Sequence, residues 1–356
     1  MFKSKSSKLA ISFLFILLFS ALCAGWMAHP NHGMLVKYGP NNIGERNNTF
    51  EPPGFLDVYQ GTERIHPLGT DGRGRDVASI LIHGSKTSLL LGFFASLLSI
   101  VFGTILGIAS AYYGNKTLKL HPLNILIVII TITLITFFAH EWSWVVTAKK
   151  LVFSYPRFVF YILVGCIFIF FSIKYLSTFL SRNISFPLDS IVMRFTEIFR
   201  AVPKLFLLLT VITFLKGQGL WTTTFLLGTL GWPRILRLVR GEVLEVKNQT
   251  FIINAQMMGL SDARIIWKHI LPNILHLLLV SMAFLISGNI LLESTLSFLG
   301  LGLPLDLPSW GGLLKQSRED FGAWWLAVFP GLTITFTLFS LNILAENYNN
   351  SAKKTI

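Results

Sequence analysis

The chain has 356 residues, of which 53% are hydrophobic and only 13% are charged, with a formal net charge of +13. About a quarter of the residues in soluble domains are charged. This composition therefore excludes a soluble protein and indicates one that crosses a membrane several times. The lysines and arginines lie mostly in short segments between apolar runs, which is the pattern of membrane topology signals and excludes a nucleic-acid-binding protein.

The first predicted element is an apolar run over residues 9–28, preceded by Lys3, Lys5 and Lys8. About 20 apolar residues suffice to span the ~30 Å hydrocarbon core of a bilayer. A cleaved signal peptide and a retained anchor share this pattern. No small-residue cleavage motif closes the run, which favours an anchor (residues 1–28) with a cytoplasmic N-terminus. Cys23 suggests a lipoprotein, but the preceding Leu22 argues against it.

Residues 29–86 are polar and rich in Pro, Gly and Asn, and we expect them to form an extracytoplasmic loop. Asp76 is placed to face the positive end of a short helix predicted over residues 77–83. His29 and His32 have the spacing of two metal ligands. Nothing nearby completes such a site, and the two cysteines, Cys23 and Cys166, lie inside apolar runs, so no metal site is predicted.

The membrane domain is predicted over residues 87–345 and begins with a helix over residues 87–113. Small residues recur at every fourth position of this helix: Ala95, Ser99, Gly103, Gly107 and Ala111. Such a stripe lets another helix approach closely in a membrane. Residues 115–187 then contain two further apolar runs, at about 123–138 and 158–175. We expect them to form an inserted hairpin that leaves the sidedness of the following segments unchanged.

The next span, residues 193–215, carries Glu197, Arg200 and Lys204 at positions i, i+3 and i+7. Charges at membrane depth are costly and usually face a cavity or a partner, so these three are candidates for a translocation path. The alternative is that they snorkel to the interface or pair with one another. A further span, residues 220–236, is interrupted by Gly231 and Pro233. It precedes the most basic loop, residues 237–272, which belongs in the cytoplasm.

Within that loop, residues 251–273 predict two short helices joined by a sharp bend. Gly259 can take the left-handed conformation that ends the first helix, and Ser261 is placed to cap a second helix that starts at Asp262. Pro272 suits the first turn of the next membrane helix, where a missing N–H costs nothing.

That membrane helix is predicted to end near residue 292, just before Glu293. This residue is either a capped, paired residue at the interface or a lining residue near the outer mouth of a path. The last span covers residues 324–344, and residues 346–356 form a cytoplasmic tail. The prediction is therefore an all-α polytopic membrane protein with about eight transmembrane helices: six core helices and the inserted hairpin.

Three stretches resemble the permease subunits of oligopeptide and dipeptide ABC importers. Residues 66–77, HPLGTDGRGRDV, and residues 293–302, ESTLSFLGLG, match motifs of that family in order. The third stretch is the bent loop, where the matching residues are Phe251, Ile252, Ala255, Gly259, Ser261, Arg264, Ile265, Ile266, Lys268, His269, Ile270, Leu271, Pro272 and Asn273. This chain departs from the loop motif at Ile253, Asn254 and Gln256.

The resemblance implies a type I ABC importer permease bundle in a bacterial cytoplasmic membrane, with both termini in the cytoplasm. Its implied partners are a homologous sister permease, two cytoplasmic ATP-binding subunits, an extracytoplasmic substrate-binding protein and membrane lipid. The implied contacts with an ATPase come from the bent loop: Ala255, Gly259, Ser261, Asp262, Arg264, His269 and Pro272. The stretch at residues 66–77 is either a rigid connector or a docking edge for the binding protein.

ATP hydrolysis is expected in a partner, since the sequence contains no Gly-x-x-x-x-Gly-Lys-Ser/Thr loop. The chain is thus expected to be no enzyme and to need no cofactor. Peptides are the implied substrate, with nickel complexes and peptide antibiotics as alternatives. A secondary transporter that uses Glu197, Arg200 and Lys204 as an ion relay would be expected to show inverted repeats, and none is visible. A membrane enzyme would need clustered histidines and carboxylates, whereas the histidines are scattered.

Overall fold

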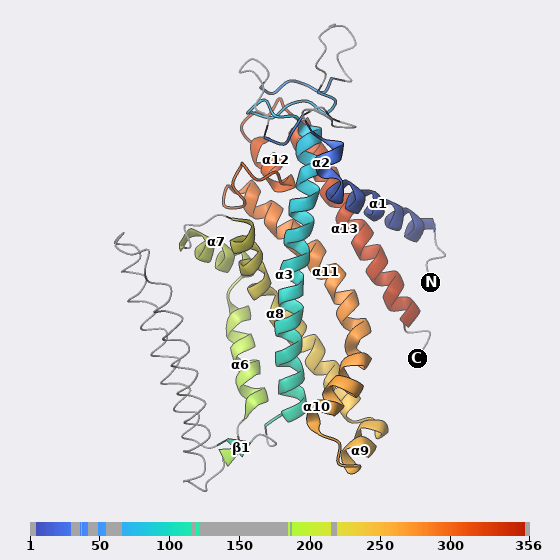
Figure 1. The fold of residues 1–356 in the computed structure, drawn as a ribbon. Helices are drawn as coiled ribbons and strands as arrows, with labels where there is room; N and C mark the ends of the chain where they lie inside the picture. Colours follow the sequence, from blue (N-terminus) through green and yellow to red (C-terminus); the bar gives the residue numbers. More distant parts are fainter. Residues whose placement is uncertain are drawn as a thin grey trace, which may run out of the picture. The chain divides into compact units, whose positions relative to one another are not determined.

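The computed structural model describes residues 5–29, 36, 38–41, 49–54, 66–115, 119–120, 184–185, 187–214 and 219–352. Apart from the two-residue antiparallel strands β1 (Lys119–Leu120) and β2 (Ile184–Ser185), the regular elements of these residues are helices (Figure 1). The chain divides into two compact units, Met1–Ile108 with Phe195–Ile356, and Ala109–Arg194. The predicted hairpin at residues 115–187 lies almost entirely outside the described residues.

Three helices of the described residues are long and apolar enough to cross a membrane: Val77–Tyr113, Asp262–Phe298 and Trp325–Ser351. Two shorter apolar helices cover Ser6–Leu22 and Lys204–Thr213. The predicted all-α membrane fold is therefore confirmed. The count of eight helices includes the hairpin and stays a prediction.

The first long helix, α3 (Val77–Tyr113), is continuous over 37 residues. The prediction of a short helix over 77–83 followed by a separate span from residue 87 was wrong. Gly84 does not break the helix, because a single glycine inside a helix costs only about 1 kcal/mol relative to alanine. It allows a close approach of Trp310, whose ring would lie 3.2 Å from a Cβ at this position. Asp76 begins the helix as expected, since its carboxylate accepts a hydrogen bond from the backbone N–H of Ser79 at 2.7 Å.

The small-residue stripe of α3 packs against α8 (Leu220–Lys247), which confirms the predicted close approach. A Cβ added to Gly103 would lie 2.6 Å from the Cβ of Ile235. The hydroxyl of Ser99 donates a hydrogen bond to the carbonyl of Gly228 at 2.8 Å. The predicted interruption at Gly231 and Pro233 was wrong, because α8 runs through both. Neighbouring helices can satisfy the carbonyl that a proline leaves free inside a membrane helix.

The span predicted over residues 193–215 is not continuous. The segment divides into α6 (Leu188–Ala201) and α7 (Lys204–Phe214), separated by Val202 and Pro203. Proline lacks the backbone N–H that would continue the helix, and its ring disfavours helical geometry in the residue before it. The sequence interpretation overlooked Pro203. As a consequence, Arg200 and Lys204 lie on two different helices.

The bent loop leads without a break into the next membrane helix. Its elements are α9 (Thr250–Met257), α10 (Asp262–Ile265), the π-helical turn η2 (Ile266–Ile270) and α11 (Leu271–Phe298). A helix beginning at Pro272 was therefore the wrong prediction. The wider π turn ends two residues before Pro272, where the ring of a proline would crowd the preceding turn of a regular helix. Because α11 continues to Phe298, Glu293 lies inside a helix.

The remaining helices are α12 (Trp310–Gln316), α13 (Trp325–Ala352), α1 (Lys5–Leu22) and the short α2 (Ala24–Met27). α1 packs along α13 (Figure 1), with the rings of Phe13 and Phe336 5.9 Å apart. Near the start of α1, the hydroxyl of Ser7 accepts a hydrogen bond from the side chain of Asn347 at 3.0 Å. α13 extends through residue 352, so most of the predicted tail is helical.

Candidate functional site

The break between α6 and α7 borders a cavity of about 560 Å³. Its walls come from this break, from α8 around Pro233 and from α11 around Gly288. The lining residues are mostly apolar, with four polar side chains among them: Phe199, Arg200, Val202, Pro203, Lys204, Leu207, Leu230, Gly231, Pro233, Arg234, Phe284, Leu285, Gly288, Asn289, Leu291 and Leu292. Pockets of this size hold small-molecule ligands in many proteins.

The charges that line the cavity all have the same sign. Arg200, Lys204 and Arg234 are its three ionisable lining residues, and no aspartate or glutamate is among the lining residues. Among the described residues, ion pairs join His66 to Asp76, Arg73 to Asp306 and Arg75 to Asp71, and none of them includes Arg200, Lys204 or Arg234. A concave wall with charges of one sign concentrates ligands of the opposite sign. The cavity is therefore suited to an anionic group.

The four residues predicted for a translocation path separate into two sets. Arg200 and Lys204 line the cavity together, whereas Glu197 is exposed on α6 and is not a lining residue. Glu293 is fully buried and lies outside the cavity lining. The sequence interpretation missed Arg234 as a cavity residue. Its place directly after a proline within an apolar span was the signal available.

Glu293 is held by serine side chains. Its carboxylate accepts a hydrogen bond from the hydroxyl of Ser297 at 2.7 Å, and the hydroxyl of Ser294 lies 3.5 Å away. The Ser297 hydroxyl in turn accepts the backbone N–H of Leu303 at 3.3 Å. Of the two interpretations of Glu293, the geometry fits the paired residue, although it is buried in the fold instead of lying at an interface. It ties α11 to the segment that follows it.

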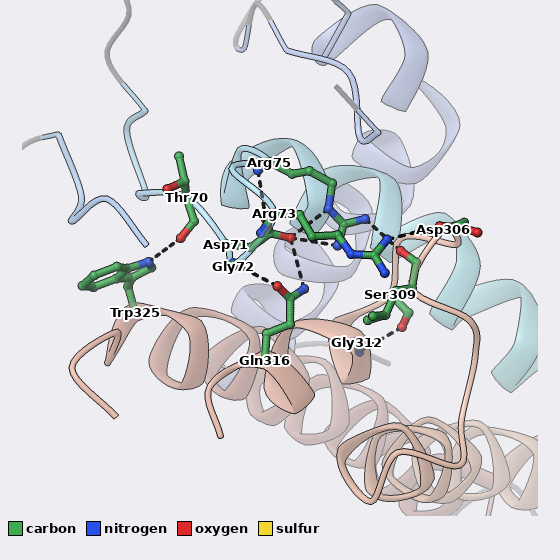
Figure 2. Close-up of polar contacts among 11 residues, drawn as sticks. Thr70, Asp71, Gly72, Arg73, Arg75, Asp306, Ser309, Gly312, Gln316 and Trp325 are labelled. Atoms are coloured by element: carbon green, nitrogen blue, oxygen red, sulfur yellow. Dashed lines mark hydrogen bonds and ion pairs between the residues drawn. The ribbon is translucent and has the colours of Figure 1, made fainter. Parts of the chain in front are cut away.

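A second buried polar network joins the stretch at residues 66–77 to the segment around α12 (Figure 2). Arg75 contacts Asp71 at 2.8 Å and donates to the carbonyl of Leu305 at 2.8 Å. The side-chain amide of Gln316 donates to the carboxylate of Asp71 at 3.1 Å and accepts the backbone N–H of Gly72 at 3.1 Å. These polar groups are used inside the fold, which favours the rigid connector over the docking edge.

The bend within residues 251–273 has the predicted geometry. Gly259 has a φ of +74°, and the backbone N–H of Leu260 donates to the carbonyl of Ala255 at 3.2 Å, closing the end of α9. Ser261 occupies the N-cap position of α10, but its side chain makes no capping hydrogen bond. The capping prediction was therefore right in position and wrong in the bond. Ile252 and Ala255 are buried and anchor the bend.

The bent loop exposes large apolar side chains that the sequence interpretation did not single out. Met257, Met258 and Trp267 are 83%, 73% and 71% exposed. Figure 1 shows α9 and α10 at the opposite end of α11 from α12. Exposed apolar groups gathered in one place mark an interaction surface. The polar residues predicted for this surface lie beside them, with Ser261, Asp262, Arg264 and Pro272 exposed, Gly259 at the bend, Ala255 beneath it and His269 half-buried.

Among the described residues, no group of three or more His, Cys, Asp and Glu side chains could hold a metal ion. The cation-lined cavity and the exposed bent loop are two features of that part of the chain that are suited to binding.

Comparison with known proteins gives consistent matches. The sequence model of the binding-protein-dependent transport system inner membrane components matches residues 174–354. A protein of Brucella suis named as a peptide transport system permease is 27% identical over 345 residues, which are 97% of this chain and 86% of that protein. The oligopeptide transport system permease protein OppC of Haemophilus influenzae is 28% identical over 81% of this chain and 70% of its own length. The dipeptide transport system permease protein DppC of Bacillus subtilis is 26% identical over 98% of this chain and 82% of its own length.

Proposed function

This chain belongs to the family of binding-protein-dependent transport system inner membrane components, and we propose that it is the permease subunit of an ATP-driven importer of peptides. The single observation that carries the proposal is the bent loop, an exposed apolar surface built on a rigid bend at the end of a long membrane helix. Peptides are proposed as the substrate because the compared permeases are named for peptide, oligopeptide and dipeptide transport.

The bent loop would bind an ATPase subunit through Met257, Met258 and Trp267, with Asp262 and Arg264 beside them. Because Asp262–Phe298 is one continuous helix, a displacement of the loop moves α11 with it. Closure of the ATPase subunits would then shift the bundle between inward-facing and outward-facing states. Such a shift requires the closed ATPase dimer to bind one state better than the other.

The proposed assembly contains this chain, a homologous sister permease, two ATP-binding subunits and an extracytoplasmic binding protein. Both termini are proposed to be cytoplasmic. The hydrogen bond between Ser7 and Asn347 supports placing both ends on the same side of the membrane, because it brings the start of α1 beside the end of α13. Arg200 and Lys204 remain the proposed path residues, and Glu197, three residues before Arg200 on α6, is proposed as the third. Glu293 is proposed to act by holding the segment after α11 in place.

The test is purification of the tagged chain in mild detergent, identification of its partners, and reconstitution with the binding protein in liposomes. We expect two ATPase subunits and a homologous permease to copurify, and uptake of a labelled peptide to require ATP. A Met257→Ser and Trp267→Ser double variant should release the ATPase subunits while the chain stays in the membrane. The matched control is Phe321→Ser. Phe321 is 92% exposed and lies beyond the end of α11 that is opposite the bent loop.

Two other outcomes would contradict the proposal or change its substrate. A chain that purifies alone and moves solute without ATP contradicts the proposal and favours a secondary transporter. Uptake of a nickel complex or a peptide antibiotic in place of a simple peptide would retain the importer and change only its substrate.

A further inference from the structure

We propose that the cavity bordered by Arg200, Lys204 and Arg234 binds a carboxylate group of the transported substrate, so that this subunit itself favours substrates with a free carboxylate. The inference rests on the proposed function as an importer. It adds the chemical group that the membrane domain recognises and the residues that recognise it.

The placement of the three cations depends on two prolines. Arg200 lies in the last turn of α6, Lys204 is the first residue of α7, and Pro203 breaks the helix between them. Arg234 follows Pro233 in α8, a third helix that lines the cavity. In a continuous helix, Arg200 and Lys204 would stack along a single helix face. The break allows them to border a cavity from different helices.

The charge of the cavity fits an anion. Three cations border one cavity whose other lining residues are apolar except for Asn289. Asn289 is almost fully buried and donates its amide hydrogen to the hydroxyl of Ser96 at 3.0 Å, so its position is fixed. A carboxylate would offset the mutual repulsion of the three cations, and an arginine binds it through two parallel hydrogen bonds.

The shape of the cavity fits a substrate of varied side chains. A volume of about 560 Å³ exceeds the needs of a single carboxylate. Phe199, Leu207 and Leu292 contribute apolar wall without directional contacts. Such a wall accepts different side chains, while the cations orient the charged end.

Gly288 offers a way to close the cavity. This residue of α11 lines it, and a Cβ added there would meet nothing within 4 Å. The side chain of a leucine at this position would therefore start in open space on the cavity wall. Gly241 of α8 is the matched control, since it also meets nothing within 4 Å but is not a lining residue.

The experiment measures ATP-driven uptake by the reconstituted complex for two labelled tripeptides, one with a free C-terminal carboxylate and one with a C-terminal amide. For Arg234→Gln and Lys204→Gln, we expect uptake of the carboxylate peptide to fall about tenfold, and uptake of the amide peptide to change much less. A charge-assisted hydrogen bond to a carboxylate is worth enough to produce a loss of this order. Lys204→Arg keeps the positive charge, so it should retain the preference for the carboxylate peptide that Lys204→Gln loses.

The cavity-filling pair separates the site from general damage. Gly288→Leu should reduce uptake of both peptides, and Gly241→Leu should leave both at the wild-type level. Equal losses for the two peptides in Arg234→Gln, or wild-type uptake in Gly288→Leu, would overturn the carboxylate site while the importer stands. Wild-type complex that transports neither peptide with ATP overturns the proposed function, and the site with it.

Discussion

The guanidinium group of Arg75 lies 2.8 Å from the carboxylate of Asp71, and both side chains are almost fully buried. Arg75 also contacts the carbonyl of Leu305, and Asp71 also contacts Gln316 (Figure 2). The pair therefore joins segments more than two hundred residues apart in sequence. A buried ion pair that is also hydrogen-bonded to its surroundings is costly to break, because one partner then stays charged without compensation.

Asp71→Asn is predicted to destabilise the protein by about 3–5 kcal/mol, since it leaves Arg75 buried without its counter-charge. The measurement is the thermal unfolding of the detergent-purified protein. The control is Asp306→Asn, which breaks the ion pair with Arg73. Those two side chains are 86% and 43% exposed, so we expect a loss below about 1 kcal/mol. Equal effects of the two substitutions would contradict the structural role of the buried pair.

Gly103→Ala is predicted to cost about 1–3 kcal/mol through overpacking, because the added Cβ would lie 2.6 Å from Ile235 and 2.9 Å from the carbonyl of Trp232. Unfolding in detergent measures this cost. Gly331→Ala is the control, because a Cβ in that part of α13 meets nothing within 4 Å. The control should be neutral or stabilising by up to about 1 kcal/mol. If Gly103→Ala is as stable as wild type, the close packing of α3 against α8 is wrong.

Gly259→Pro is predicted to abolish ATP-driven uptake while the chain remains in the membrane. The ring of proline holds φ near about −65°, which is incompatible with the φ of +74° at this bend. Gly259→Asn should retain most of the uptake, because asparagine tolerates the left-handed region. Uptake is compared with the amount of chain in the membrane fraction. Normal transport by the proline variant would disprove the role of the bend as a lever.

Glu293→Leu is predicted to cost about 1–3 kcal/mol, because the buried hydroxyl of Ser297 loses its acceptor. Glu293→Gln keeps a carbonyl acceptor at that place and should cost less. Thermal unfolding ranks the two variants, and uptake is measured in parallel. A Gln variant with unchanged stability but no uptake would instead assign Glu293 to the translocation path.

Several local features could be predicted because few residues decide them. The bend at Gly259 depends on one residue that adopts a positive φ at little cost, and the cap of α3 depends on an acidic residue next to the first turn. The contact between α3 and α8 follows from side-chain size along one helix face. The role of the bent loop was inferred from its resemblance to a family, whereas the exposure of Met257, Met258 and Trp267 was not predicted.

Other features depended on the surroundings of each residue. Pro233 and Pro203 both lie within apolar runs, yet α8 continues through the first and the second separates α6 from α7. Pro233 is buried in the helix bundle, whereas Pro203 and Val202 are exposed. Neighbouring groups in a buried environment can compensate for the backbone hydrogen bond that a proline removes. An exposed position offers no such compensation, so the helix ends there.

By itself, the sequence determined that the chain enters a membrane, that its helices approach closely along small residues, and that a bent loop lies within the most basic segment. These properties depend on composition and on spacing along one chain. Only the tertiary structure decided where the helices continue or break, that Glu293 is held by serines, and that Arg200, Lys204 and Arg234 border one cavity. The physical reason is that burial and proximity between distant segments depend on packing, which spacing along the chain does not specify.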